Sequence, residues 1–160
     1  METEKRIISI LVKNQPGVLS RISGLFSRRG YNIDSLSVCA TEDDRYSRMT
    51  ITVTGTKATV KQIISQVEKQ EDVEKVLDFD EYAVVFRELL LIKVNVKSSE
   101  RSQIVDLCEI FKAKAIDICE ETMILELTGS TQKIDAFIKI LIPYTIIEMA
   151  RTGGAALERG

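Results

Sequence analysis

The sequence contains no histidine among its 160 residues. Histidine is the commonest general base, the usual activator of a nucleophile and the commonest metal ligand. Its absence removes all three roles at once, and no glycine-rich phosphate loop is present either. We therefore expect no catalytic site and no metal site in this chain, although catalysis by Glu, Lys or Tyr groups stays open.

Cysteine is scarce as well. Cys39, Cys108 and Cys119 are odd in number, widely spaced and form no Cys-x-x-Cys motif. Each lies within an apolar pattern, so we expect three buried free thiols rather than a disulfide or a set of metal ligands.

Long apolar runs and an excess of one charge are also missing. No run approaches the roughly 18 residues that cross a bilayer, and the first five residues do not resemble a signal peptide. A net charge of −2 offers no attraction to nucleic acid or to an anionic membrane. With 44% apolar and 29% charged residues, the composition is that of a globular protein. We expect a cytoplasmic chain.

Hydrophobic periodicity predicts the order β-α-β-β-α-β within residues 1–80. The strands are expected at 5–13, 33–40, 48–54 and 73–79, and the helix stripes are Val18, Ile22, Leu25 and Phe26, then Val60, Ile63, Ile64 and Val67. This is a ferredoxin-like unit with both helices on one face of the sheet and the first and third strands central. Because the third strand alternates apolar and polar residues, we expect its second face to be covered only by a partner.

The same order returns in residues 84–160, after a linker at 80–83. Strands are expected at 89–97, 114–119, 122–128 and 144–151, and the helix stripes are Ile104, Leu107, Cys108 and Phe111, then Ile134, Phe137, Ile138 and Leu141. The prediction is an α+β fold of two tandem ferredoxin-like units, 1–80 and 84–160, each small enough to need help from domain or chain packing. Arg87-Glu88 and Glu120-Glu121 are expected to be solvated strand ends and a turn.

One stretch, Asn14-Gln15-Pro16-Gly17-Val18-Leu19-Ser20, favours a ligand site. A strand runs into it and a helix starts from it, so unpaired N–H groups and a partial positive charge face a bound carboxylate. Gly17 allows close approach, and Asn32, one helix later, supplies an amide that donates and accepts. We interpret this as a pocket for a small α-amino acid; an ordinary strand–turn–helix junction is the alternative. The second unit lacks this loop, so no second site is expected there.

These residues and others resemble the small regulatory subunits of acetohydroxyacid (acetolactate) synthase. The likeness runs in the family's order through 14–21, 24–36, 47–51, 87–94, 109–111, 129–130, 133–137 and 150–153. It covers nearly the whole chain, and the run Gly24–Leu36 is its most specific part. Thr152 stands where the family more often has serine, and the tail after Gly153 matches less closely.

The resemblance implies an N-terminal ACT domain, which is a ligand-sensing ferredoxin-like module, and a C-terminal domain of similar topology. Such subunits are not catalytic: they activate a large thiamine-diphosphate-dependent subunit, which condenses pyruvate to 2-acetolactate, and confer feedback inhibition by valine or another branched-chain amino acid. Thiamine diphosphate, Mg and FAD are expected only in that large subunit, which we expect the C-terminal domain to contact. The implied effector site combines Asn14, Gly17, Val18 and Leu19 of one chain with Asn32 and Ile33 of another, across an ACT–ACT homodimer.

Strand 33–40 is the expected pairing edge of that dimer. Two other functions stay open. The first is a free-standing amino-acid sensor that controls a different target, although no basic helix-turn-helix is visible. The second is a small enzyme on a ferredoxin-like scaffold, which fold alone does not exclude.

Overall fold

The computed structural model describes residues 2–160, which form two compact units. One unit runs up to Phe86 and also includes Gly153–Gly160, and the other is Arg87–Thr152. The elements are β1 (Glu4–Lys13), α1 (Val18–Arg28), β2 (Ser35–Ala40), β3 (Tyr46–Gly55), α2 (Lys57–Glu68), β4 (Val73–Phe79), β5 (Val84–Asn95), α3 (Arg101–Phe111), β6 (Lys114–Ile118), β7 (Thr122–Gly129), α4 (Thr131–Leu141), β8 (Ile146–Arg151) and β9 (Ala155–Glu158). The predicted β-α-β-β-α-β order is confirmed in both units.

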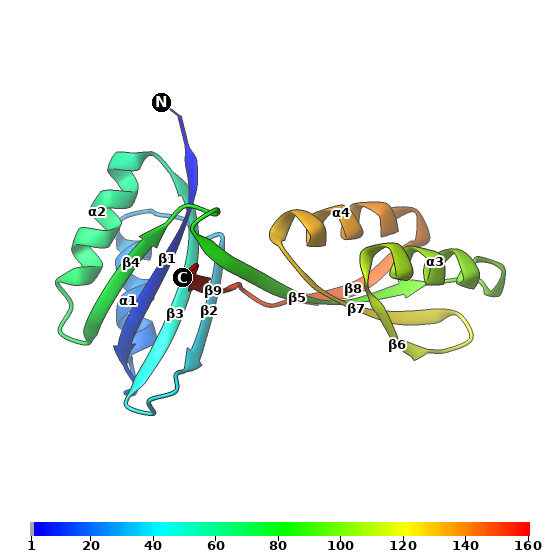
Figure 1. Ribbon diagram of the computed structural model, residues 1–160, viewed down its shortest axis with the longest axis horizontal. Coiled ribbons are helices and arrows are strands. Elements are labelled where there is room, and N and C mark those ends of the chain that lie inside the picture. Colours follow the sequence, from blue (N-terminus) through cyan, green and yellow to red (C-terminus); the bar gives the residue numbers. More distant parts are fainter. Residues whose placement is uncertain (1) are drawn as a thin grey trace. The chain divides into compact units, whose positions relative to one another are not determined.

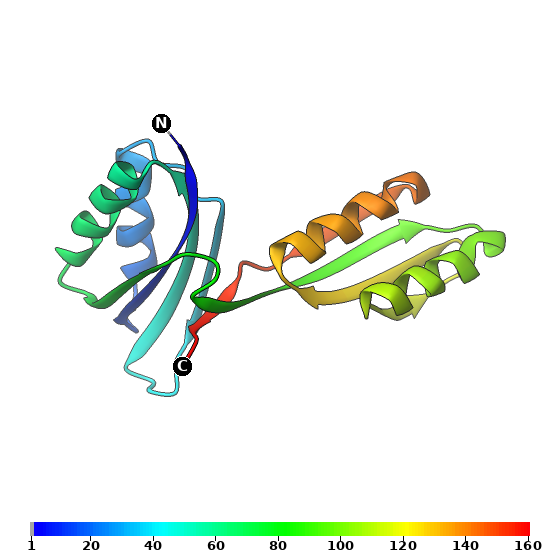
Figure 2. The ribbon, with the colours of Figure 1, turned by 45° about the horizontal axis from the view of Figure 1, so that its top comes forward.

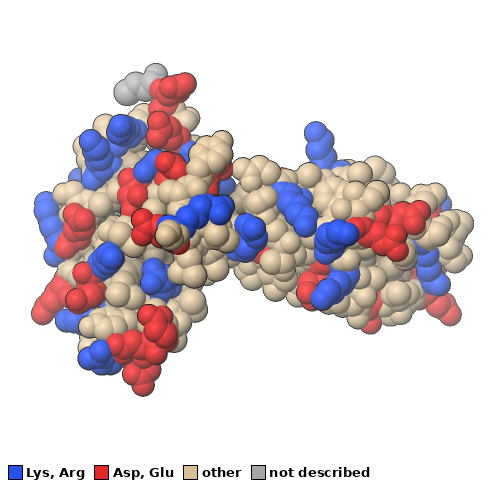
Figure 3. Space-filling view, viewed as in Figure 1, with Lys and Arg blue, Asp and Glu red and all other residues tan. Residues whose placement is uncertain are grey.

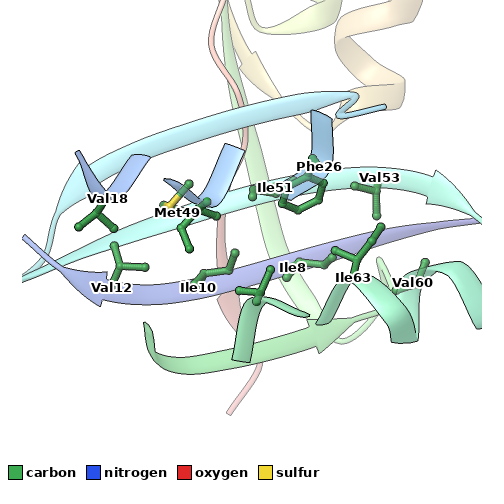
Figure 4. Close-up of a cluster of buried hydrophobic side chains, with 12 residues drawn as sticks. Ile8, Ile10, Val12, Val18, Phe26, Met49, Ile51, Val53, Val60 and Ile63 are labelled. Atoms are coloured by element: carbon green, nitrogen blue, oxygen red, sulfur yellow. The ribbon is translucent and has the colours of Figure 1, made fainter. Parts of the chain in front are cut away.

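The first unit has an antiparallel sheet in the order β2-β3-β1-β4. Strands β1 and β3 are central, as predicted, and α1 and α2 cover one face (Figure 1). Apolar residues of β1 and β3 pair across this face, with Ile8 opposite Ile51 and Ile10 opposite Met49. The helices contribute Val18, Ile22 and Phe26 from α1 and Val60, Ile63 and Val67 from α2. Figure 4 shows Val18, Phe26, Val60 and Ile63 of this set over the sheet.

The second face of this sheet is covered by the chain itself rather than by a partner. Thr50 and Thr52 of β3 are 3% and 1% exposed. A second apolar cluster lies on this face, made of Ile7, Phe79, Val84 and Ala156. The expectation that only a partner covers this face is therefore wrong, because the pattern did not reveal β9, which pairs with the start of β5 (Figure 2).

The C-terminal residues Gly153–Gly160 also change where the boundary between the two units lies along the chain. The sequence placed residues 84–160 in one domain, whereas the compact units assign Gly153–Gly160 to the first of them. Strand β5 also begins at Val84, five residues earlier than the predicted 89, so it contributes to both units. The chain therefore passes between the units twice, once within β5 and once after Thr152.

The second unit repeats the architecture with strand order β6-β7-β5-β8 and α3 and α4 on one face. Its buried core includes Met123, Leu125 and Leu127 of β7, together with Ile104, Ile134, Phe137 and Leu141 of the helices. Helix α4 ends just before Pro143, and a single 3-10 turn (Ile142–Tyr144) leads into β8.

Of the charge pair Arg87-Glu88, Arg87 is exposed as expected, but Glu88 was wrongly placed at the surface. The Glu88 side chain is only 5% exposed, and the Arg151 guanidinium donates to both of its carboxylate oxygens at 3.1 Å. Arg151 also donates to Asp135 of α4 at 2.7 Å. Glu88 is buried because β5 is an inner strand of the sheet, paired to β7 and β8, so the predicted solvated strand end does not exist here.

The cysteines follow the prediction only in being free. Cys108 is buried on α3, and burial raises the pKa of its thiol, whereas Cys39 and Cys119 are exposed. The expectation of burial was wrong for these two because Cys39 lies on the edge strand β2 and Cys119 lies in the β6–β7 turn.

Within residues 2–160, no helix combines the length and apolarity that a membrane crossing requires. The same residues hold no group of three or more His, Cys, Asp or Glu side chains placed to bind a metal. Basic and acidic side chains are interspersed over the face seen in Figure 3.

Candidate functional site

The loop from β1 to α1 is held at its base by backbone hydrogen bonds to two neighbouring turns. The Lys13 N–H donates to the Asp72 carbonyl, and the Asn14 N–H donates to the Arg45 carbonyl, both at 2.8 Å. Pro16 and Gly17 then turn the chain, and α1 begins at Val18. Gly17 has φ +85°, a left-handed conformation that a residue without Cβ adopts freely.

The start of α1 leaves its backbone donors open. Its N-cap, Gly17, offers no side chain to accept from the first turn, and the Val18 N–H reaches the Gln15 carbonyl only at 3.5 Å. The amides of Leu19 and Ser20 belong to the first turn and have no partner within the helix. These groups and the positive end of the helix dipole favour a small anion such as a carboxylate.

Arg21 lies over Gly17 from the same helix. Its Nε and Nη2 contact Asp72 Oδ2 at 2.8 and 2.7 Å, and its Nη1 sits 3.0 Å from where a Cβ on Gly17 would lie. This positive charge beside the loop was not predicted. The spacing of four residues, which puts two positions on one helix face, was the available signal.

Asn14 is oriented by the β2–β3 turn. Its Nδ2 donates to the Asp44 carbonyl at 3.0 Å, which leaves Oδ1 as an acceptor. The turn itself is shaped by Asp43, which accepts from the Arg45 backbone N–H at 3.1 Å and binds the Arg45 guanidinium. The side-chain hydrogen bonds from Arg45 lower the pKa of Asp43 to about 2.

The three apolar residues expected at the site differ in what they can offer. The Val18 side chain is 3% exposed and packs in the core, so only its backbone N–H faces the loop. Leu19 is 46% exposed, and Ile33 is half-buried against the core. Leu19 is thus the side chain of this loop best placed to meet an aliphatic ligand.

Asn32 and Ile33 lie beyond the other end of α1. Gly30 has φ +68°, and the Tyr31 N–H donates to the Phe26 carbonyl at 3.0 Å, which ends the helix with the chain reversal expected of a C′ glycine. Asn32 is exposed, and its amide has no hydrogen-bond partner among residues 2–160. Since α1 has 11 residues, its length of about 16 Å separates this amide from the Gly17 loop.

One chain therefore assembles half of the expected site. It brings Asn14, Gly17, Val18 and Leu19 together and leaves Asn32 and Ile33 a helix length away. Next to these two residues, β2 forms an edge of the sheet, with Val38 40% exposed. The strand begins at Ser35 rather than at the predicted 33, so Asn32 and Ile33 precede it.

Two ferredoxin-like units, the first with an open helix start after a Pro-Gly turn, define the ACT class of regulatory modules. The AHAS small subunit-like ACT domain matches residues 8–75, and the family described as small subunit of acetolactate synthase matches residues 87–160. This chain belongs to the acetolactate synthase small subunit family, and the resemblance found in its sequence is confirmed.

Individual relatives cover nearly the whole chain. The probable acetolactate synthase small subunit of Archaeoglobus fulgidus is 46% identical over 156 residues, which is 98% of each chain. The acetolactate synthase small subunit of Mycolicibacterium smegmatis is 42% identical over 99% of this chain and 93% of its own. The crystal structure of the acetolactate synthase small subunit from Thermotoga maritima superposes with a TM-score of 0.90, at 40% identity over 98% of each chain.

Proposed function

We propose that this chain is the regulatory subunit that activates the thiamine-diphosphate-dependent large subunit of acetolactate synthase and makes it sensitive to valine or a related branched-chain amino acid. It acts in the cytoplasm as a homodimer and holds no cofactor of its own; thiamine diphosphate, Mg and FAD belong to the large subunit. The effector binds between two ACT domains. The large subunit condenses two pyruvates to 2-acetolactate, or pyruvate with 2-oxobutyrate.

The separation of the two half-sites along α1 carries this proposal. A free α-amino acid is far shorter than the helix, so it cannot contact the Gly17 loop and Asn32 of the same chain. In a two-fold dimer the same patch of each chain faces the other, so the loop of one chain meets Asn32 and Ile33 of its partner at two equivalent sites. The open edge of β2 lies beside Asn32 and Ile33 and offers unpaired backbone groups for that contact.

The chemistry of the paired half-sites matches a zwitterion. The effector carboxylate accepts from the amides that follow Gly17, beside the positive charge of Arg21. The ammonium donates to Asn14 Oδ1 and to the amide oxygen of Asn32 from the partner, and Leu19 and Ile33 contact the aliphatic side chain. Apolar walls discriminate by only about 1–3 kcal/mol per methylene, so valine, leucine and isoleucine bind with graded affinity.

Regulation follows because a ligand held by two chains stabilises one dimer geometry over another. Only such a difference in affinity between two states can be passed to a second protein. The coupling free energy in allosteric systems is typically about 1–3 kcal/mol, which suffices to convert effector binding into inhibition of the large subunit.

The test is to titrate valine into the purified chain by calorimetry and to assay the cognate large subunit with and without this chain across the same valine range. We expect binding, activation without valine, and inhibition with it. Gly17→Asp should abolish valine binding because its carboxylate occupies the helix start and repels that of the ligand. Gly17→Ala is the matched control, since it shares the Cβ and the strain of a positive φ but lacks the charge.

Equal valine binding by Gly17→Asp and Gly17→Ala would reject the proposed site. Absence of any effect on the large subunit, with valine still bound, would instead favour the free-standing sensor.

A further inference from the structure

We infer that the C-terminal strap, defined as residues 153–159, transmits effector binding from β2 of the ACT unit to the second unit. This inference rests on the proposed function and concerns how the same site regulates. The strap follows directly on β8, the last strand of the second unit, yet it packs within the first unit.

The strap begins where it is pressed against β2. A Cβ on Gly153 would lie 2.6 Å from the Leu36 carbonyl oxygen and 2.9 Å from Ser37 Cβ. Both distances are below those that real Cβ atoms show, so this backbone contact exists only because residue 153 is a glycine. Leu36 follows Ile33 by three residues, which places the contact on the strand that leads out of the effector half-site.

The next residues anchor the strap to the sheet. A Cβ on Gly154 would overlap the Phe86 ring, and Ala156 is 5% exposed in the second apolar cluster. The Arg159 N–H donates to the Ala83 carbonyl at 3.0 Å, and its Nε donates to the Tyr82 carbonyl at 3.1 Å. The strap is therefore a packed element of the ACT unit rather than a loose end.

The residues before the strap are fixed just as firmly within the second unit. The Thr152 N–H donates to the Leu89 carbonyl at 3.0 Å, and the Leu89 N–H donates to Thr152 Oγ1 at 2.9 Å. Arg151 binds Glu88 of β5 and Asp135 of α4. Only one residue, Thr152, separates Arg151, with its ion pairs, from Gly153, which contacts β2.

This sequence of contacts gives a short route for coupling. A shift of β2 on effector binding displaces Gly153, because the backbone of Gly153 lies directly against Leu36 and Ser37 with no side chain between them. The displacement reaches Arg151 through two covalent links, and Arg151 holds α4 and β5. Close-packed elements pass on such shifts instead of absorbing them.

The test uses the full chain with its cognate large subunit and valine as the probe. Gly153→Val introduces a side chain between the strap and β2, and Gly160→Val is the matched control because no atom lies within 4 Å of its Cβ position. For Gly153→Val we expect unchanged valine affinity by calorimetry, unchanged activation without valine, and loss of most of the inhibition. A coupling of about 5- to 150-fold should fall towards one. Gly160→Val should behave as the wild type.

Inhibition of wild-type extent in Gly153→Val would overturn the inference. Loss of valine binding or of activation would overturn it too, because the strap would then support the site or the large-subunit contact instead of linking them. If the wild-type chain itself neither binds valine nor responds to it, the result rejects the proposed function, and the inference about the strap falls with it.

A second measurement needs no variant and covers the case in which Gly153→Val does not fold. Hydrogen exchange of the wild-type chain, with and without valine, should show added protection in β2, in the strap and in β8 together. Protection confined to β2 and the loop, with the strap and β8 unchanged, would contradict transmission through the strap.

Discussion

A site shared between two chains predicts that two inactive variants restore binding when they are combined. Gly17→Asp destroys the loop half-site, and Asn32→Ala removes the amide of the other half-site. Each homodimer then carries two damaged sites. A heterodimer of the two carries one site with both lesions and one that is intact, because the Asn32→Ala chain supplies the loop and the Gly17→Asp chain supplies Asn32.

The magnitudes follow from the groups removed. A hydrogen bond to a charged group contributes about 1.5–3 kcal/mol, so losing the Asn32 contact to the ammonium should weaken valine binding about 10- to 150-fold. Random association of equal amounts gives about half heterodimers, so about a quarter of all sites are restored. The length of α1, about 16 Å, ensures that a single chain cannot bypass the lesions.

The assay is calorimetric titration of valine into heterodimers isolated with two different affinity tags. We expect wild-type affinity at one site per heterodimer and weak or no binding by either homodimer. Isolated heterodimers that bind no valine would refute the shared site, and so would an Asn32→Ala homodimer that binds as the wild type does.

Two further predictions concern the supports of the fold. The pKa of Asp43 is lowered to about 2 from an ordinary 3.8, so Asp43 should keep its ion pair with Arg45 well below pH 4. The ion pair stabilises the folded state fully above pH 3.8, and this stabilisation is lost as the pH falls through 2. Carbon NMR of the Asp43 carboxyl should show this midpoint, and Arg45→Gln should raise it; a midpoint near 3.8 in the wild type would be a contradiction. Glu88→Leu should lower the free energy of unfolding, measured by urea titration, by about 2 kcal/mol, because Arg151 loses two charged hydrogen bonds at a buried carboxylate. Asp135→Asn is the control: the Asp135 carboxylate is 59% exposed, so this variant should lose less than about 1 kcal/mol in the same titration.

The sequence was informative wherever a local pattern determines a local structure. The period of the apolar residues located both β-α-β-β-α-β units, and handedness placed β1 and β3 at the centre of the first sheet. The Asn-x-Pro-Gly turn predicted an open helix start. These features depend on residues close together in the chain, so alternation and turn chemistry suffice to find them.

Features that depend on residues far apart were missed. The strap contains a four-residue strand, β9, paired to a segment about seventy residues earlier, and no period can be read in so short a stretch. Its one local signal was the pair Gly153-Gly154, both of which would clash with neighbours if they carried a Cβ. Cys39 was misplaced because the last three residues of β2, Val38, Cys39 and Ala40, are all exposed, and alternation does not show where along a strand burial ends.

Three features of the molecule converge on β2, a strand of six residues. Asn32 and Ile33 lead into it, its outer edge is open in the single chain, and the backbone of Gly153 lies on Leu36 and Ser37. Because a strand is hydrogen-bonded along its length to β3, it moves as a unit more readily than residue by residue. In the proposed dimer, an amino acid that draws Asn32 towards the partner's loop would therefore act at the same time on the edge of β2 and on its contact with Gly153. Under the proposed function, the ligand changes this geometry and the large subunit performs the chemistry.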